Sequence, residues 1–381
     1  MTEVSVVIPC LNEAKTLPIV IDMAKSGLSK VSLSGEIMIA DNGSDDGSQV
    51  LAESLGARVV PVKNRGYGNA LATGILAAEG KYIIFADADG SYDFSQLPVF
   101  IEALRKGADL VIGNRFARKM EKNAMPALHR YLGTPVLTTL INFFFKTKIS
   151  DCNCGMRGIK KESFEKMQIL STGMEFASEM VIKAGLLGMK VVEVPIYFMK
   201  DKRDREPHLR TWHDGWRHLR LILIYAPNYL FIYPGSILFV SGSILLFMQI
   251  FGPIVIGPMY MDLHFMILGL MLSVLGLSIF LMGATIKQFS YQHDYYLEDF
   301  TVTFFERSSF EKKLVPGTLF FAIGTGLAVG IFIRWIGGHF ANPNMLRGAL
   351  FSLYFMSTGL LVSLFSFLEL VMRIQNKEKN K

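Results

Sequence analysis

The sequence predicts an α/β head with a mostly parallel sheet, followed by an interfacial helix and four transmembrane α-helices. In residues 1–199, short strand-like runs alternate with helical stretches, which is the pattern of a parallel sheet covered by helices. Beyond residue 227 the chain contains two stretches of 59 residues with almost no charge, 228–286 and 314–372. A membrane-spanning helix needs about 20 apolar residues, so each stretch has room for two spans and a short link.

The residues that follow the predicted strands are the first place to look for a site, because ligands of parallel sheets bind beyond the carboxyl ends of the strands. The strands are predicted at Val4–Pro9, Glu36–Asp41, Arg58–Val62, Lys81–Asp87 and Asp109–Gly113. The helices between them are predicted at Ala14–Gly27, Gly47–Leu55, Tyr67–Ala78 and Phe94–Lys106. The four spans are predicted at 229–251, 263–286, 315–336 and 348–372.

The charge pattern also predicts how the chain is oriented in the membrane. The predicted segments are a head at 1–199, an amphipathic juxtamembrane segment at 200–227, spans at 228–286, a linker at 287–313, spans at 314–372 and a tail at 373–381. The linker and the tail are basic, whereas the links 252–262 and 337–346 contain no Lys or Arg. By the positive-inside rule, the head, the linker and both termini are expected to be cytoplasmic. In that reducing compartment Cys10, Cys152 and Cys154 are not expected to form disulfides.

Composition and motif spacing exclude several other classes of protein. The chain is 51% hydrophobic, which excludes a disordered or collagen-like chain, and its net charge of +6 is too small to require nucleic acid. Cys152 and Cys154 lack a second pair or a nearby His, so a structural role is favoured over half of a metal site. Gly66 and Gly68 do not follow the first strand, and Leu71 stands at the third glycine position, which argues against a dinucleotide site. These glycines either lead a loop into a helix or let the backbone approach a nucleotide.

Polar and acidic side chains follow three of the predicted strands. Asn12 and Glu13 follow the first strand, Asp41 ends the second, and Asp87 and Asp89 follow the strand that begins at Lys81. Acids that meet at one sheet edge repel one another, so such a cluster normally binds a cation. A hard divalent ion bound by one or two carboxylates and by substrate phosphates is typical of Mg²⁺ or Mn²⁺.

These runs resemble those of a known family over about residues 3–225, and the membrane region matches in plan only. The first half of the head resembles the nucleotide-sugar half of glycosyltransferase family 2, which has the GT-A fold, in the runs Val4–Pro9, Asn12–Glu13, Asp41–Asp46 and Asp87–Asp89. The second half is similar to the polyprenyl-phosphate branch, which includes dolichol-phosphate mannose synthase and bacterial polyprenyl-phosphate glucosyltransferases. That similarity rests on Gly113–Arg115, Arg130, Asp151 and Gly155–Arg157.

The resemblance implies a role for each matched residue. The base and ribose pocket would be lined by Pro9, Asn12, Glu13 and Asp41. Asp87 would contact the nucleotide, and Asp89 would hold the divalent ion that bridges the diphosphate. The acceptor phosphate would be bound by Arg115 and Arg130. Asp151 matches an acid proposed as a base in some members, and the alternatives for it are a sugar-positioning acid or a local loop cap.

Physical chemistry adds three arginines to this set. A phosphate acceptor carries about −1.5 to −2 charges at neutral pH, so its oxygen is a competent nucleophile that needs little help from a base. The reaction does need relief of repulsion between the two phosphate-bearing reactants, by a metal ion on one and arginines on the other. The planar guanidinium suits that task. We therefore add Arg157 for the acceptor phosphate and Arg203 and Arg205 for the donor.

Two departures from the family pattern leave the donor open between the UDP-glucose and GDP-mannose classes. Ser91 stands where many mannosyl members have Gln, and the run 203–210 replaces the usual R-x-x-G-x-S-K. Glu175 and Glu179, four residues apart, share one helix face and are further candidates for contacts with sugar hydroxyls. The sequence also leaves the oligomeric state open, with a homo-oligomer as one alternative.

The juxtamembrane segment is predicted to lie on the membrane surface. Four apolar side chains share one helical face, and three arginines nearby are within reach of lipid phosphates. The apolar residues are Trp212, Trp216, Leu219 and Leu223, and the arginines are Arg210, Arg217 and Arg220. The alternative is an ordinary helix packed on the head. A second surface-lying element is predicted at Phe289–Phe310, which is rich in aromatic residues.

The prediction for function is an inverting transferase that moves one hexose from a nucleotide-diphosphate sugar to undecaprenyl or dolichyl phosphate at the cytoplasmic membrane face. A processive polysaccharide synthase is the first alternative, but Q-x-x-R-W is absent before the spans, since Arg334–Trp335 lies within a span and is preceded by Ile331. A transporter or lipid flippase with a regulatory head is the second. It is disfavoured because Arg334 and Arg347 lie near span ends, where they can snorkel, and Asp262 lies in a link.

Overall fold

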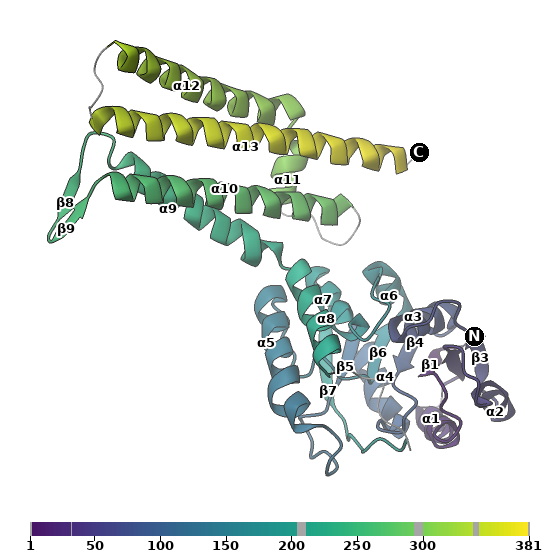
Figure 1. Cartoon of the computed structure of the whole chain (residues 1–381). Coiled ribbons are helices and arrows are strands. Elements are labelled where there is room, and N and C mark those ends of the chain that lie inside the picture. The colour runs from purple at the N-terminus through teal and green to yellow at the C-terminus, as the bar shows by residue number, and fades with distance from the viewer. Residues whose placement is uncertain (1, 32, 204–210, 293–299, 338–342, 380–381) are drawn as a thin grey trace. The chain divides into compact units, whose positions relative to one another are not determined.

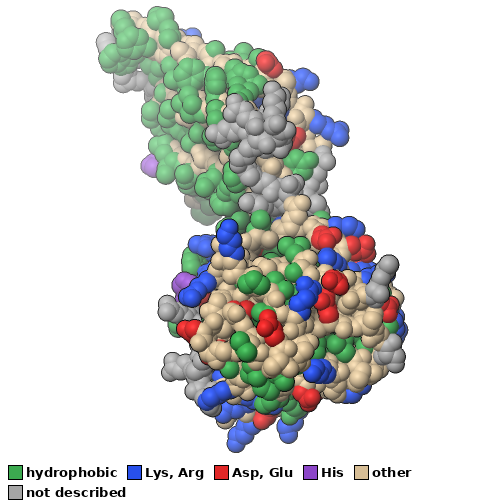
Figure 2. Space-filling view, turned by 90° about the vertical axis from the view of Figure 1, so that its right-hand side faces the viewer, with side chains coloured by type: hydrophobic (Ala, Val, Ile, Leu, Met, Phe, Trp, Pro, Cys, Tyr) green, Lys and Arg blue, Asp and Glu red, His purple; other side chains and the backbone are tan. Residues whose placement is uncertain are grey.

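The computed structural model describes residues 2–31, 33–203, 211–292, 300–337 and 343–379. The chain folds into two compact units, a head at Met1–Tyr225 and a four-helix unit at Ala226–Lys381 (Figure 1). On the face that Figure 2 shows, charged side chains are scattered over the head, whereas hydrophobic side chains predominate over the described part of the four-helix unit. The uneven charge of the sequence therefore corresponds to two physically different bodies.

The head is built on a seven-stranded sheet of order β3-β2-β1-β4-β6-β5-β7. Its strands are β1 Val4–Cys10, β2 Gly35–Asp41, β3 Arg58–Pro61, β4 Tyr82–Phe85, β5 Leu110–Asn114, β6 Arg157–Lys160 and β7 Val191–Pro195. All strands run parallel except β6, which is antiparallel to β4 and β5. Every residue of β1 is buried, as expected for a central strand covered on both faces.

Helices cover this sheet and include the four that the sequence predicts. They are α1 Leu17–Val31, α2 Ser48–Ser54, α3 Tyr67–Ala77, α4 Leu97–Arg105, α5 Thr134–Phe145, α6 Lys161–Met167, α7 Phe176–Leu186 and α8 Thr211–Ile224. Helix α1 buries Leu17, Val20, Ile21 and Ala24, the one-sided spacing of an amphipathic helix. The mostly parallel α/β architecture predicted from the sequence is therefore confirmed.

The four-helix unit contains four helices long and apolar enough to span a membrane, in the regions that the sequence predicts. Its elements are α9 Tyr233–Phe247, β8 Ile254–Ile256, β9 Met259–Met261, α10 Leu263–Gln292, α11 Phe300–Arg307, α12 Phe310–Ile336 and α13 Pro343–Lys379. Helix α9 follows a π-helical turn, Asn228–Ile232. Of the predicted surface element 289–310, residues 293–299 lie outside the described residues, and α11 forms part of the rest.

Glycines bring the helices of each sequential pair into close contact. A Cβ on Gly276 of α10 would lie 2.3 Å from the backbone nitrogen of Phe239 in α9. A Cβ on Gly359 of α13 would lie 2.4 Å from the backbone nitrogen of Phe321 in α12. Small residues at such positions allow the backbone contact on which helix association in lipid depends.

Replacing Gly276 by leucine is expected to separate α9 from α10 and to lower the thermal stability of the detergent-solubilised protein by several degrees. Overpacking of this kind costs about 1–3 kcal/mol or more. The matched control is Gly330→Leu on α12, where an added Cβ would meet no atom within 4 Å. Equal melting temperatures for the two variants would contradict the role of the glycine contact.

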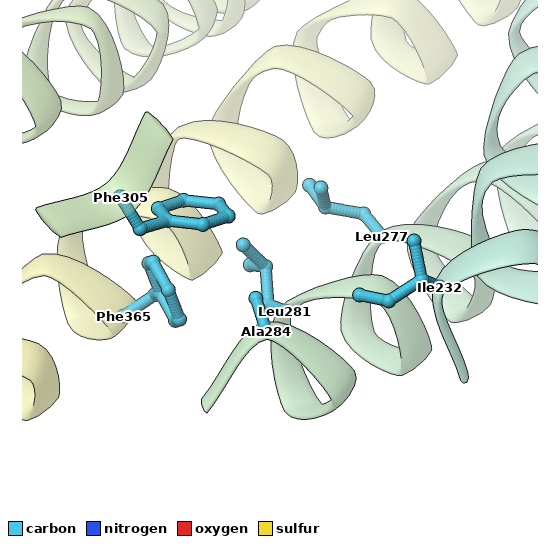
Figure 3. Close-up of a cluster of buried hydrophobic side chains, with 6 residues drawn as sticks. All are labelled: Ile232, Leu277, Leu281, Ala284, Phe305 and Phe365. Atoms are coloured by element: carbon cyan, nitrogen blue, oxygen red, sulfur yellow. The ribbon is translucent and has the colours of Figure 1, made fainter. Parts of the chain in front are cut away.

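A hydrophobic cluster joins the two helix pairs and α11 (Figure 3). Phe305 of α11 and Phe365 of α13 pack edge to face, with ring centroids 5.3 Å apart. The other buried members are Ile232, Leu277, Leu281 and Ala284. The ring of Phe305 thus anchors α11 to the bundle.

A buried ionic network centred on Glu369 lies beside this cluster. The carboxylate of Glu369 accepts hydrogen bonds from Lys313, from Gln288 at 2.9 Å and from Arg373 at 2.7 Å. Lys313 and Arg373 also donate to the carbonyl oxygen of Phe305, at 2.8 and 2.6 Å. Two cations therefore bind both Glu369 and the C-terminal turn of α11, where helix carbonyls attract positive charge.

Arg347 of α13 does not extend toward solvent as the sequence interpretation expected. Its side chain is buried and forms an ion pair with Asp262, which immediately precedes α10. A buried arginine needs a counter-charge in a membrane environment, and Asp262 supplies it. This ion pair links the two helix pairs.

Candidate active site

The parallel strands end at a single edge of the sheet, and several of the predicted site residues lie there. Asp41 ends β2, Asp87 follows β4, and Arg115 follows β5. Strand β6 runs in the opposite direction and begins at this edge with Arg157, so the loop that precedes it, with Asp151, lies here as well. The sheet thus brings together residues far apart in the sequence.

Asn12 fixes the loop after β1 against the loop after β2. Its backbone adopts a left-handed conformation, with φ of 58°, that Asn tolerates better than most residues. Its backbone nitrogen donates to Ser44 at 2.9 Å, and its side-chain oxygen accepts from the nitrogen of Asp45 at 2.9 Å. Pro9 is buried within β1, opposite Ala40 of β2, so it shapes the strand beneath these loops.

Asp41 is buried, and only one of its two carboxylate oxygens accepts hydrogen bonds from the described residues. Oδ2 accepts from the backbone nitrogens of Gly43 and Ser44 and from Gln49 at 2.7 Å. Oδ1 is buried and finds no hydrogen-bond partner among the described residues. Leaving a buried acceptor unpaired costs about 1–3 kcal/mol, so this atom is suited to receive an N–H or O–H of a ligand.

Asp87 and Asp89 are held in place by neighbouring hydroxyl groups. Tyr67 donates to Oδ1 of Asp87 at 2.8 Å, and Ser91 donates to Oδ1 of Asp89 at 2.6 Å from its hydroxyl and 2.9 Å from its backbone nitrogen. Burial and the charge of Asp89 raise the pKa of Asp87 to about 6. The negative charge of Asp89 thus disfavours ionisation of Asp87, and a cation bound beside both carboxylates would relieve that repulsion.

Arg203 places its guanidinium between three acids at this edge. Its Nε lies 2.8 Å from Oε1 of Glu13, and its Nη1 lies 3.6 Å from Oδ2 of Asp89 and 3.6 Å from Oδ2 of Asp201. The same guanidinium therefore contacts a residue predicted to bind the nucleotide and the residue predicted to hold the metal. Arg205 belongs to the segment 204–210 and lies outside the described residues.

A divalent ion at Asp89 would depend on ligands that the donor brings. Among the described residues, no group of three or more His, Cys, Asp or Glu side chains could hold a metal ion on its own. The pair Asp87 and Asp89 still fits an ion that diphosphate oxygens help to coordinate, because Mg²⁺ is commonly bound through one or two carboxylates plus substrate phosphates. Asp87 and Asp89 are therefore compatible with a divalent ion that is bound together with the diphosphate of the donor.

Arg115 and Asp151 form a buried, two-pronged ion pair. Nε and Nη2 of Arg115 each donate to one oxygen of Asp151, both at 2.7 Å, and the aspartate side chain is 0% exposed. The guanidinium also lies over the ring of Phe198, 5.2 Å from its centroid. Both oxygens of Asp151 are thus bound to arginine, and the carboxylate orients Arg115.

Arg157 and Arg130 lie in very different environments. Arg157 is 1% exposed and donates to the carbonyl oxygens of Cys152, Cys154 and Ala177 at 2.7, 2.9 and 2.6 Å, so it holds the loop before β6. Arg130 is exposed in a π-helical turn, His129–Gly133, with its guanidinium 5.4 Å from the ring of Tyr131. Burial and the charge of Arg115 lower the pKa of His129, which lies in the same turn as Arg130.

Glu175 and Glu179 are engaged with protein groups. Glu179 is fully buried and accepts from the backbone nitrogen of Ser171 at 2.7 Å and the hydroxyl of Tyr225 at 2.9 Å. Glu175 accepts from Arg217 of α8 at 2.6 Å. They hold the segment 168–175 and α8 on the head.

The glycines of the G-x-G run serve this same packing. A Cβ on Gly66 would lie 2.3 Å from the carbonyl oxygen of Thr172, and one on Gly68 would lie 2.3 Å from that of Ser171. The close approach that these glycines permit is therefore to the protein's own backbone.

Helix α8 buries one face and exposes the other. Asp214, His218 and Ile222 are buried, whereas Trp212 is 81% exposed and Trp216 is more than half exposed. Trp212 and Trp216, which belong to the apolar face predicted to contact the membrane surface, are therefore not covered by the rest of the head. Leu219 and Leu223, further along the predicted face, are partly buried.

His218 is expected to make the head less stable in mild acid. Burial lowers its pKa to about 4 from an ordinary 6.5, and its Nδ1 lies 2.7 Å from the hydroxyl of Ser178. Between pH 6.5 and about pH 4, His218 binds a proton in the unfolded chain but not in the folded head. The free energy of unfolding therefore falls by up to about 3 kcal/mol as the pH is lowered across that window. Thermal unfolding between pH 5 and 8 should show a smaller pH dependence in His218→Asn. His213→Asn, on the exposed side of α8, should behave like the unsubstituted protein.

Two family descriptions match separate parts of the chain. Residues 5–168 match the family described as "Glycosyl transferase family 2", and residues 284–373 match "Glycosyltransferase family 2 C-terminal transmembrane region". A low-salt glycan biosynthesis hexosyltransferase of Haloferax volcanii is 34% identical over 338 residues, which cover 88% of this chain and 81% of that protein. A dolichyl-phosphate hexose transferase of the same organism is 31% identical over 162 residues, covering 42% of this chain and 68% of that protein.

Solved structures are less similar in sequence to this chain than these relatives are. The crystal structure of glucosyl-3-phosphoglycerate synthase from Mycobacterium tuberculosis, in complex with Mn²⁺ and UDP-glucose, aligns with a TM-score of 0.46 and 20% sequence identity. The alignment covers 58% of this chain and 78% of that one.

Proposed function

This chain belongs to glycosyltransferase family 2, and we propose that it transfers a single hexose, with inversion, from a nucleotide-diphosphate sugar to undecaprenyl or dolichyl phosphate at the cytoplasmic membrane face. The observation that carries the proposal is the sheet edge that has Asp41, Asp87 and Asp89 at the ends of β2 and β4 and the Arg115–Asp151 ion pair at the end of β5. Acids on one side suit a metal-bound donor, and an oriented arginine on the other suits a phosphate acceptor. The four apolar helices of the same chain suit a lipid-linked acceptor.

On the donor side, each carboxylate has a distinct task. The available Oδ1 of Asp41 would accept a hydrogen bond from the base or the ribose. Asp89, held by Ser91, would be a ligand of Mg²⁺ or Mn²⁺, and that ion would neutralise the departing diphosphate. Arg203 would leave Asp89 for the diphosphate when donor and ion bind, because the ion takes over the charge that Arg203 now balances.

On the acceptor side, Arg115 and Arg130 would bind the phosphate. Asp151 fixes Arg115 in one orientation, so little conformational freedom remains to be lost when the phosphate arrives. The phosphate oxygen is already an anionic nucleophile, so no residue need remove a proton from it. One displacement on the face of the sugar opposite the diphosphate would invert the anomeric centre. In this proposal Asp151 positions Arg115, and Arg157 is left out of the acceptor site.

The head carries two exposed apolar helix faces suited to a lipid surface. Helix α8 exposes Trp212 and Trp216, and α5 with the turn before it exposes Tyr131, Val136 and Phe143. The two helices are joined at their starts, where Nε2 of His129 lies 3.0 Å from the hydroxyl of Thr211. We propose that these faces rest on the cytoplasmic leaflet, in keeping with the basic linker and tail, and bring Arg130 to the depth of lipid phosphates.

Product analysis tests the proposed function. The purified full chain in lipid vesicles should convert labelled UDP- or GDP-hexose, Mg²⁺ or Mn²⁺ and polyprenyl phosphate into a lipid carrying one labelled hexose. A polymeric product would instead indicate a processive synthase. Movement of lipid-linked sugar across the vesicle without turnover of donor would indicate a flippase. No labelled lipid with any uridine- or guanosine-linked hexose would overturn the proposal.

Asp151→Asn separates a positioning role from a base role. If Asp151 orients Arg115, the variant should lower kcat/KM for polyprenyl phosphate by about 10²-fold, because a small displacement of a binding group has that effect, and should leave the pH profile unchanged. If Asp151 is a base, the substitution should remove the acidic limb of the profile. Arg115→Lys should reproduce the positioning defect, since lysine keeps the charge but loses the two-pronged contact.

A further inference from the structure

The link between α9 and α10, residues 250–261, is a β-hairpin without a single charged side chain. Strands β8 and β9 pair antiparallel, with Val255 opposite Tyr260. The turn between them begins at Gly257, whose φ of +56° suits the tight turn that closes a two-residue hairpin. Figure 1 shows this hairpin projecting beyond the ends of the two helices.

The hairpin exposes an unusually apolar surface. Phe251 is 100% exposed and Val255 is 65% exposed. The other large side chains that are more than a third exposed are Ile250, Ile256, Met259 and Tyr260. Isolated two-stranded hairpins are marginally stable in water, and a contiguous apolar patch on a protein usually marks a binding surface. Something other than water is therefore expected to cover these side chains.

The position of the hairpin indicates that lipid covers its exposed apolar side chains. It continues from the apolar, exposed surfaces of α9 and α10, represented near the link by Phe247 and Ile267. Three-residue strands extend about 10 Å, whereas the headgroup layer on each side of the hydrocarbon is roughly 5–8 Å deep, so most of the hairpin stays within reach of that layer. Asp262, the first charge after the hairpin, is neutralised by Arg347.

The backbone of the hairpin determines how deep it can lie. Strands β8 and β9 form a sheet of two, so each has one edge whose N–H and C=O groups are not paired within the sheet. Open edges are not tolerated in the hydrocarbon core, where nothing hydrogen-bonds to them, but water and headgroups satisfy them at the interface. We propose that residues 250–261 lie in the boundary between headgroups and acyl chains of the leaflet that borders this link, with Phe251, Val255 and Tyr260 in contact with lipid.

Spin labelling of the full chain in phospholipid vesicles tests this placement. Single cysteines at Phe251, Val255 and Tyr260 would carry a nitroxide, and collisions with O₂ and with a water-soluble nickel chelate would be measured. Cys10, Cys152 and Cys154 are buried, so the unsubstituted protein gives the labelling background. Ser26→Cys on the exposed surface of the head is the water control, and Leu327→Cys on the exposed face of α12 is the hydrocarbon control.

The expected ratio of O₂ to nickel collisions lies between the two controls at all three positions. Val255 and Tyr260 face each other across the hairpin, so their labels should report nearly equal depth. A ratio equal to the Ser26 control would place the hairpin in water and overturn the proposal. Low collision rates with both reagents would also overturn it, because they would show that protein, either a second copy or another partner, covers the hairpin.

Discussion

Replacing Asp89 by alanine is expected to lower hexose transfer by about 10³-fold or more while the protein still inserts into the membrane. The substitution removes the carboxylate that we propose as the metal ligand, and a metal that neutralises a departing diphosphate contributes several kcal/mol to the transition state. It also removes a counter-charge of Arg203, whose Nη1 lies 3.6 Å from Asp89. Transfer rates measured over a range of Mg²⁺ and Mn²⁺ concentrations check the result.

The control for this variant is a nearby acid outside the proposed site. Asp93 lies four residues further along, and its oxygens accept from the nitrogen and hydroxyl of Ser95 at the start of a short helical turn. Asp93→Ala should lose a local cap and keep nearly all activity. Asp89→Asn keeps the shape and an acceptor for Ser91, so a loss as large as that of Asp89→Ala would assign the effect to charge. Retention of activity in Asp89→Ala would remove the metal role.

Replacing Glu369 by leucine is expected to destabilise the four-helix unit by about 3–5 kcal/mol, the cost of breaking a buried ion pair from one side. Lys313 and Arg373 would lose the carboxylate to which both bind. The side chain of Lys313 is 9% exposed and that of Arg373 is 26% exposed, so water would solvate neither charge fully. The contact of α11 with the bundle should weaken too, because the same cations bind the carbonyl oxygen of Phe305. Unfolding in detergent, followed by temperature or by protease sensitivity near residue 307, measures this.

A double replacement tests whether uncompensated charge is the cause. Lys313→Met with Glu369→Leu removes one cation together with the anion and should recover part of the lost stability, since apolar replacements of buried ion pairs are often neutral. Glu306→Gln is the matched control, because Glu306 lies 3.8 Å from Arg373 at a more exposed position. An equal loss from Glu306→Gln would contradict the central role of Glu369.

The sequence predicts the sheet edge at β1 to β5, because each of these parallel strands appears in the sequence as a short apolar run that polar residues follow. This pattern predicts the positions of Asp41, Asp87 and Arg115 at the ends of their strands. Strands β6 and β7 were not predicted. Strand β6 reads Arg-Gly-Ile-Lys, with too few apolar residues to signal a strand, and it pairs antiparallel between two strands that precede it in the chain.

The partners of the site residues were the least predictable part. No local pattern shows that Asp151 binds Arg115, 36 residues away, or that Arg157 is buried among backbone carbonyls. Long-range contacts of this kind depend on the complete sheet. The signal that could have been used is burial: Arg157 begins a strand that pairs on both sides, where a charged side chain must find internal partners.

The glycine contacts also have a consequence for biogenesis. Each lies within a pair of consecutive helices, α9 with α10 and α12 with α13, so each pair can associate as soon as its second helix has left the translocon. The Glu369 network requires residues from α10, α12 and α13 and closes only after the last helix has been synthesised. This order predicts that a nascent chain stopped after α10 already holds a compact two-helix unit in the bilayer, while α11 is captured at the final step.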